Sequence, residues 1–279
     1  MLARASASLE LEAGKPPTDL TLDLGAGLFQ EFAAGGEAAY NPLLSYPPRG
    51  TCMNYSGDLD LGAMLGAGTK AEDTTGLTGR ALDAGSQLTV TGPKGAPIPL
   101  PRANQEATTG PYAALLGGTL PIGDGPSLPP FLDGGQYTVK GPGGKDVGSF
   151  SVSLNVPQGV TWTDQKRIKQ VDRNSGFTFN WSGGGSSQIV LVGGASTDQK
   201  NQVAAGFFCS APAAQGSFTV PPNVLANLPA SIGEDAEQTL GALMVATMPD
   251  APFQTFTANG LDTGLALYFL VSATTVPYK

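Results

Sequence analysis

The sequence predicts an all-β protein, an antiparallel β-sandwich of the immunoglobulin-like or jelly-roll kind, built as one large unit or as two packed β domains. Short segments alternate apolar and polar residues with the two-residue period of a strand. The 279 residues include 39 glycines and 23 prolines, which would interrupt long helices. Charged residues make up 14% of the chain and hydrophobic residues 41%, a balance that favours a folded core over disorder.

Alternation supports the individual elements. Residues 20–24 alternate leucine with Thr and Asp, residues 150–156 alternate apolar residues with Ser and Asn, and residues 177–181 alternate aromatic residues with Thr and Asn. A polar face of this kind is typical of antiparallel sheets with one solvated side. The other predicted strands, in chain order, are 87–91, 136–140, 160–163, 188–192, 207–209, 217–220, 242–248, 253–258 and 265–272. Residues 221–229 predict one short helix, because prolines stand at both ends.

The organisation of the chain changes near Val147 and Gly148. Residues 1–147 form an irregular Gly/Pro-rich β region, whereas residues 148–279 hold denser strands typical of a β-sandwich domain. The alternative is one continuous domain. Residues 89–95 (TVTGPKG) and 138–144 (TVKGPGG) share a pattern of a strand entering a tight turn, which indicates either duplicated hairpins or coincidence.

Two isolated cysteines, Cys52 and Cys209, are predicted to form a disulfide, since they lack the spacing of a redox or metal motif. Two buried thiols are the alternative. The bond would close a loop of about 157 residues, which the chain-entropy model values at roughly 5 kcal/mol.

The disulfide favours an extracellular, cell-surface or periplasmic location. The first residues (MLARAS) lack the apolar stretch of a secretory signal, so we expect either a cytosolic protein or a sequence that starts after a removed leader. No window is long and apolar enough to span a bilayer, the nearest being residues 264–276.

The composition excludes several classes of function. With no histidine, Ser-His-Asp and Cys-His catalysis and the usual zinc sites are absent. No phosphate-binding glycine motif is present, and the net charge of −8 disfavours nucleic acid as a partner.

Carboxylates offer two kinds of site. Asp58 with Asp60, and Glu234 with Asp235 and Glu237, are candidates for a calcium site or for solvated acidic patches. Paired acids such as these could also run glycoside hydrolysis, although no pair has a special claim to it. We therefore expect either no cofactor or calcium.

Trp162 and Trp181 are the candidates for stacking on a sugar. Trp181 shares a face with Phe177 and Phe179, and Trp162 with Val160, so core packing is the favoured alternative for both.

Five segments carry a resemblance to known proteins: residues 82–90, 131–139, 143–150, 160–163 and 179–184. Over about two-thirds of the chain the sequence resembles uncharacterised secreted bacterial β-sandwich proteins, especially acidobacterial ones. The resemblance implies an exported immunoglobulin-like or related fold, and it implies no activity.

These observations favour an exported, non-catalytic structural or adhesive protein of the cell surface or extracellular matrix. Unpaired edge strands would let it join copies of itself or other surface proteins. A carbohydrate-binding module, with or without calcium, is the first alternative, and polysaccharide would then be its partner. A carboxylate-based glycoside hydrolase is the second.

Overall fold

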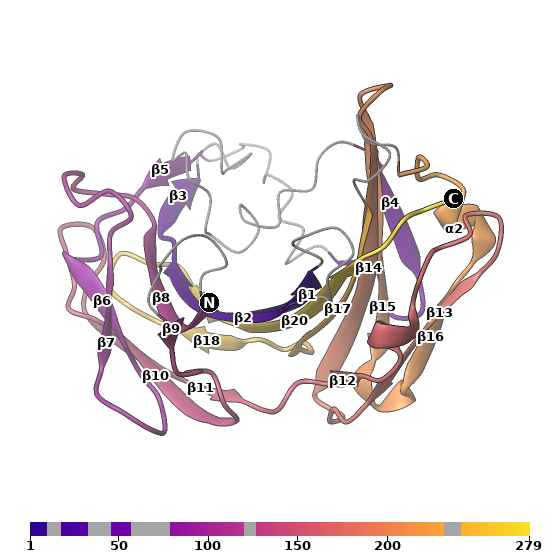
Figure 1. Ribbon diagram of the computed structural model, residues 1–279. Coiled ribbons are helices and arrows are strands. Elements are labelled where there is room, and N and C mark those ends of the chain that lie inside the picture. Colours follow the sequence, from indigo (N-terminus) through magenta and orange to yellow (C-terminus); the bar gives the residue numbers. More distant parts are fainter. Residues whose placement is uncertain (10–17, 33–45, 57–78, 120–126, 232–240) are drawn as a thin grey trace.

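The computed structural model describes residues 1–9, 18–32, 46–56, 79–119, 127–231 and 241–279, and these residues form a nearly all-β protein (Figure 1). The all-β class predicted from alternation is confirmed. The strands are β1 (Leu2–Leu9), β2 (Thr18–Gly27), β3 (Gln30–Phe32), β4 (Cys52–Ser56), β5 (Gly79–Ala81), β6 (Gln87–Thr91), β7 (Ile98–Pro101), β8 (Tyr112–Thr119), β9 (Ser127–Leu128), β10 (Gly135–Gly141), β11 (Phe150–Val156), β12 (Thr161–Trp162), β13 (Phe177–Ser182), β14 (Gln188–Asp198), β15 (Val203–Pro212), β16 (Ser217–Val220), β17 (Gly241–Pro249), β18 (Gln254–Phe256), β19 (Gly264–Ala266) and β20 (Tyr268–Thr275). The helical turns are η1 (Gln165–Arg167), η2 (Ala213–Gln215) and α2 (Pro222–Leu225).

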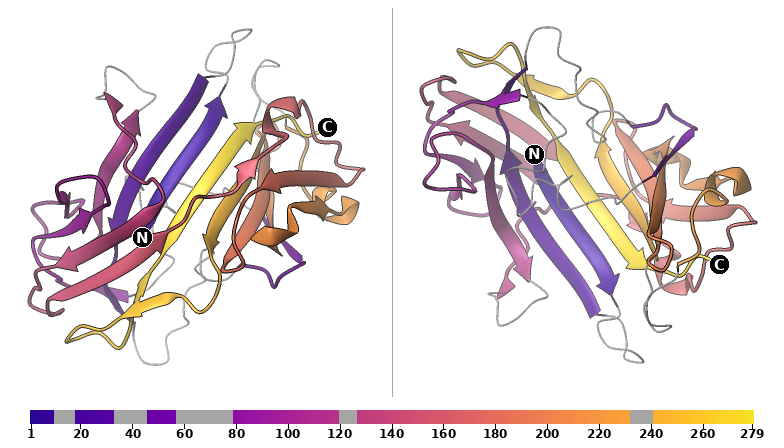
Figure 2. Two further views of the ribbon diagram at one scale, coloured as in Figure 1. Left: turned by 90° about the horizontal axis from the view of Figure 1, so that it is seen from below. Right: turned by 90° about the horizontal axis from the view of Figure 1, so that it is seen from above.

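One large sheet organises the molecule. Within the described residues it has nine strands in the order β4-β15-β14-β17-β20-β1-β2-β8-β9. Its pairs are antiparallel except one, because β1 runs parallel to β20, with Leu2 beside Tyr268. Figure 2 shows β1, β2 and β20 side by side in the middle of this sheet. The first and last long strands of the chain are therefore neighbours.

Two smaller sheets pack against the outer face of the large one (Figure 1). A four-stranded sheet, β11-β10-β6-β7, lies at one end, and a three-stranded sheet, β12-β13-β16, lies at the other. The alternating pattern explains the packing: along β11 every second residue is buried and the residues between are exposed. The large sheet thus forms two sandwiches, one with the four-stranded sheet and one with the three-stranded sheet.

Three apolar clusters fill the layers. Successive residues of the large sheet belong to different clusters, as with Leu2 and Ala3, because neighbouring side chains point to opposite faces. The cluster under the four-stranded sheet includes Leu88, Val90, Tyr112, Tyr137, Val152 and Leu154. The cluster under the three-stranded sheet includes Trp162, Phe179, Trp181, Phe207, Leu225 and Val245. A third lies on the opposite face of the large sheet and includes Ile189, Phe208, Met244, Phe269 and Val271.

The large sheet joins the two regions expected from sequence. The predicted boundary at Val147 and Gly148 falls in the loop between β10 and β11, two strands that pair along seven positions. In the nine-stranded order, the four described strands of residues 148–279 lie between β4 on one side and β1, β2, β8 and β9 on the other. Backbone pairing among the described strands therefore crosses this boundary in both sheets, and one continuous domain stays the alternative to two.

The two T-V-x-G-P-x-G segments pair with each other. Val90 of β6 lies opposite Val139 of β10, and Thr91 lies opposite Thr138. Each strand then leads through its Gly-Pro turn into an outer strand, β7 in one hairpin and β11 in the other. The four-stranded sheet is thus a pair of hairpins related by an approximate two-fold axis.

Helical structure is scarce. The segment predicted as a helix forms α2, whose Val224 and Leu225 are buried. Over the described residues, the chain has no helix long and apolar enough to cross a membrane.

Candidate functional site

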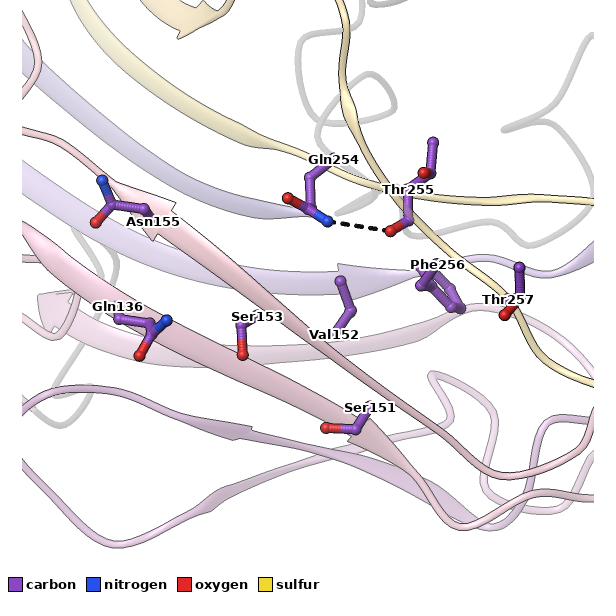
Figure 3. A pocket seen from close by; sticks show the side chains of 9 residues that line it. All are labelled: Gln136, Ser151, Val152, Ser153, Asn155, Gln254, Thr255, Phe256 and Thr257. Carbon is purple, nitrogen blue, oxygen red and sulfur yellow. Dashed lines mark hydrogen bonds between the residues drawn. The ribbon is translucent and has the colours of Figure 1, made fainter.

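An open groove of about 560 Å³ lies between β11 and β18 (Figure 3). One side is formed by the β10–β11 hairpin and the other by the β18 segment. Its lining residues are Gln136, Ser151, Val152, Ser153, Asn155, Gln254, Thr255, Phe256 and Thr257.

Strand alternation places the polar groups of the hairpin side. Ser151, Ser153 and Asn155 are the exposed residues of β11, whereas the residues between them are buried. Asn155 lies directly opposite Gln136 of β10, so two amide side chains come from one cross-strand pair. Ser153 is paired with Thr138, and their hydroxyl oxygens are 3.3 Å apart.

An aromatic contact positions the β18 side. The ring of Phe256 stacks on that of Phe150, with centroids 4.8 Å apart and an angle of 26° between the planes. A Cβ added at Gly264, which is paired with Phe256 across the β18–β19 ribbon, would come within 2.4 Å of the same ring. The ring therefore covers the glycine backbone and holds β18 beside β11.

The chemistry of the groove is neutral. Its lining side chains are amides, hydroxyls, one valine and one phenylalanine, so none of them can act as a general acid or base at neutral pH. They can donate and accept hydrogen bonds to uncharged ligands.

The groove also follows a strand edge. Among the described strands, β11 hydrogen-bonds to β10 alone, so the backbone groups on its other side face the groove. The opposite edge of the same sheet is β7, where Pro99 and Pro101 have no N–H to offer. Edge strand β4 lies beside α2, and the side-chain amide of Asn54 donates to the carbonyl of Val224 at 2.9 Å.

No known family, curated protein or solved structure matches this chain.

The two tryptophans lie in the core. Trp162 is 6% exposed and Trp181 is 4% exposed, so neither ring offers a face on which a sugar could stack. The indole N–H of Trp181 donates to the carbonyl of Ala213 at 2.7 Å, and Trp162 packs on Phe179 with ring centroids 5.5 Å apart. Both rings occupy core positions, as the alternation along their strands favoured. Their burial contradicts the sugar-stacking role for which they were candidates.

Cys52 and Cys209 form the predicted disulfide. They lie directly opposite one another on β4 and β15, with Cα atoms 4.0 Å apart. The bond ties the edge strand β4 to the large sheet across 157 residues of chain.

The five acidic candidates for calcium, Asp58, Asp60, Glu234, Asp235 and Glu237, lie outside the described residues. Within the part of the chain that the structure describes, no three His, Cys, Asp or Glu side chains gather in a way that could hold a metal ion. Calcium stays a prediction.

Asp83, in the loop between β5 and β6, has structural partners. Backbone N–H groups of Gly85 and Lys145 donate to the Asp83 carboxylate at 2.9 and 3.1 Å, and Arg102 pairs with it. These contacts, the Gly85 N–H first, hold the pKa of Asp83 below its ordinary value. Asp83 therefore stays ionised and fixes the turn rather than supplying a catalytic proton.

Both sides of the groove were predicted from the sequence as strands. That the two strands lie next to each other was not predicted. Residues 150–156 and 253–258 are about a hundred residues apart, and no local pattern reports which strands lie together across a sandwich. The contact of Phe150 with Phe256 creates the site.

Proposed function

We propose that the protein is an exported, non-catalytic structural or adhesive protein that binds other polypeptide chains at the β11 groove by strand addition. The observation that carries the proposal is the edge of β11, a seven-residue strand without proline or charge that opens on the groove and pairs with β10 alone among the described strands. An uncharged edge without proline is a template for another strand.

The remaining features support an exported binding protein. A disulfide suits an oxidising compartment. The neutral groove supports recognition through backbone hydrogen bonds in preference to acid–base chemistry.

A synthetic heptapeptide of alternating Ser and Val tests strand addition. In the presence of saturating peptide, the backbone amides of Ser153 and Asn155 should exchange with solvent at least about tenfold more slowly, because each gains a partner. A peptide of the same length in which Pro replaces every Ser is the control. If both peptides leave these amides unprotected, strand addition is wrong.

A carbohydrate-binding module is the second candidate, since amides and hydroxyls also bind sugar hydroxyls. Neutral oligosaccharides added with and without calcium should then raise the melting temperature. A glycan-specific rise together with no effect of the Ser-Val peptide would favour this candidate over the adhesive one.

A further inference from the structure

The two hairpins of the four-stranded sheet correspond residue by residue. Superposing β6 on β10 through the shared Thr-Val pair places Val152 of β11 at the position of Ile98 of β7, because these residues lie opposite Val139 and Val90. The register then sets Ser153 against Pro99, Leu154 against Leu100, and Asn155 against Pro101.

The prolines of β7 reveal how the edge of β11 is oriented. Proline is tolerated in a sheet where its missing N–H would face away from the neighbouring strand. Pro99 and Pro101 lie opposite Thr89 and Gln87 of β6, so their nitrogens face the outside of the sheet. By the same register, the N–H groups of Ser153 and Asn155 face the groove. One hairpin thus has a blocked outer edge where its counterpart has an open one.

The pattern of β11 is symmetric about its middle. Counting outwards from Ser153, buried Val152 matches buried Leu154, exposed Ser151 matches exposed Asn155, and Phe150 matches Val156. Two such strands pairing antiparallel around Ser153 would therefore set buried residues beside buried ones and polar residues beside polar ones. A slip of one residue would reverse this match.

We propose that the partner at the groove is a second copy of this chain, paired antiparallel through β11 with the two-fold axis at Ser153. This inference rests on the proposed strand addition and names its occupant. Two four-stranded sheets would then form one continuous sheet across the pair.

The charges allow this pairing. In the row that crosses the junction, Lys140 and Ser151 of one copy meet Asn155 and Gln136 of the other, so no like charges lie opposite one another. The groove residues of β18 are also neutral.

The blocked edge limits the assembly. Pairing of β11 with β11 is isologous and closes after two copies, whereas pairing of β11 with β7 would be head-to-tail and could continue into a fibre. Pro99 and Pro101 prevent the second arrangement. The structure therefore favours a dimer over the open polymer that unpaired edges alone would allow.

Sedimentation of the full chain over a wide dilution series tests the proposal. The wild type should pass from monomer to dimer as the protein concentration rises. In the dimer, the backbone amides of Ser153 and Asn155 should exchange with solvent more slowly. Ser153→Lys should weaken association by more than about tenfold, since two lysines would meet on the axis. Thr138→Lys is the matched control, because it adds the same charge to the same face one strand further from the junction.

Two further variants use the chain's own blocked edge. Ser153→Pro with Asn155→Pro copies β7 onto β11 and should give a monomer. Pro99→Ser with Pro101→Asn opens the second edge and should give species larger than a dimer.

The outcomes separate the two proposals. A wild type that stays monomeric while the Ser-Val peptide protects β11 would overturn self-pairing and leave strand addition standing. A monomer that ignores the peptide would overturn both. A dimer that Ser153→Lys and Thr138→Lys weaken equally would show that the contact lies elsewhere.

Discussion

Asp23 is a fully buried carboxylate that joins three parts of the fold. It accepts two hydrogen bonds from Arg4, its cross-strand partner, at 2.6 and 2.8 Å. It also accepts the backbone N–H groups of Phe131 and Leu132 at 2.6 and 2.9 Å. These four donors satisfy the carboxylate oxygens inside the sheet. Asp23 thereby fastens the segment that precedes β10 to β1 and β2.

Asp23→Asn should lower the free energy of unfolding by about 3 kcal/mol, because it leaves the Arg4 cation and buried N–H groups with a weaker acceptor. Urea denaturation measures the loss. Asp19→Asn is the control: Asp19 pairs with Lys166 at the exposed end of β2, and its loss should cost less than about 1 kcal/mol. Equal losses in the two variants would contradict the role given to Asp23.

The raised pKa of Tyr137 predicts a loss of stability at alkaline pH. Burial, followed by the nearby charge of Asp133, raises its pKa to about 12 from the ordinary value of 10. The folded state therefore holds the proton more tightly than the unfolded state, and this contribution to stability is lost as the pH rises from about 10 to 12. The difference in phenolate absorbance between wild type and Tyr137→Phe should show a midpoint near the upper value. A midpoint at the ordinary pKa would contradict it.

Strand β4 is held by one short ladder and one covalent bond. Five residues pair it with β15, and the disulfide between Cys52 and Cys209 lies at one end of that ladder. Replacing both cysteines by serine should lower the free energy of unfolding by up to about 5 kcal/mol. Hydrogen exchange should show β4 losing protection before β14 and β17 in the middle of the sheet. Unchanged exchange at β4 would mean that its backbone pairing suffices.

Strands with a clear alternation of apolar and polar residues could be predicted from the sequence. Strands in which small residues give little apolar contrast could not. Residues 87–91, 150–156 and 217–220 form strands with the expected bounds. Strand β1 escaped prediction because alanine and serine give little apolar contrast along it. In β2 the alternation pointed to the leucines as the buried face, yet Leu22 and Leu24 are half-buried and Asp23 is fully buried. Asp23 is buried because Arg4 pairs with it from the neighbouring strand, and no pattern within β2 predicts that partner.

At the scale of the whole molecule, the net charge opposes self-association. Each copy carries a formal charge of −8, while the proposed junction is neutral. Added salt shortens the range of repulsion, from about 10 Å at 0.1 M to about 3 Å at 1 M. The proposed dimer should therefore associate more tightly as sodium chloride rises, as measured by sedimentation. Dissociation by salt would indicate a junction made of ion pairs instead.

The candidate site could be predicted only in its parts. The polar face of residues 150–156 and the principle of strand addition were accessible from sequence, because both follow from alternation and composition. The neighbourhood of β18 and the contrast between β7 and β11 required the sheet order. Prolines 99 and 101 were visible throughout, but their meaning depends on lying at the edge opposite β11.

The parallel pairing of β1 with β20 sets the order in which the chain can mature. Residues 2–8 find their neighbours on one side in residues 268–274, so the central sheet cannot close until residue 274 has been synthesised. Contacts this distant in sequence slow folding towards the millisecond-to-second range typical of all-β proteins. A polypeptide with this layout keeps its central sheet open for as long as the ribosome takes to make the residues between these two strands.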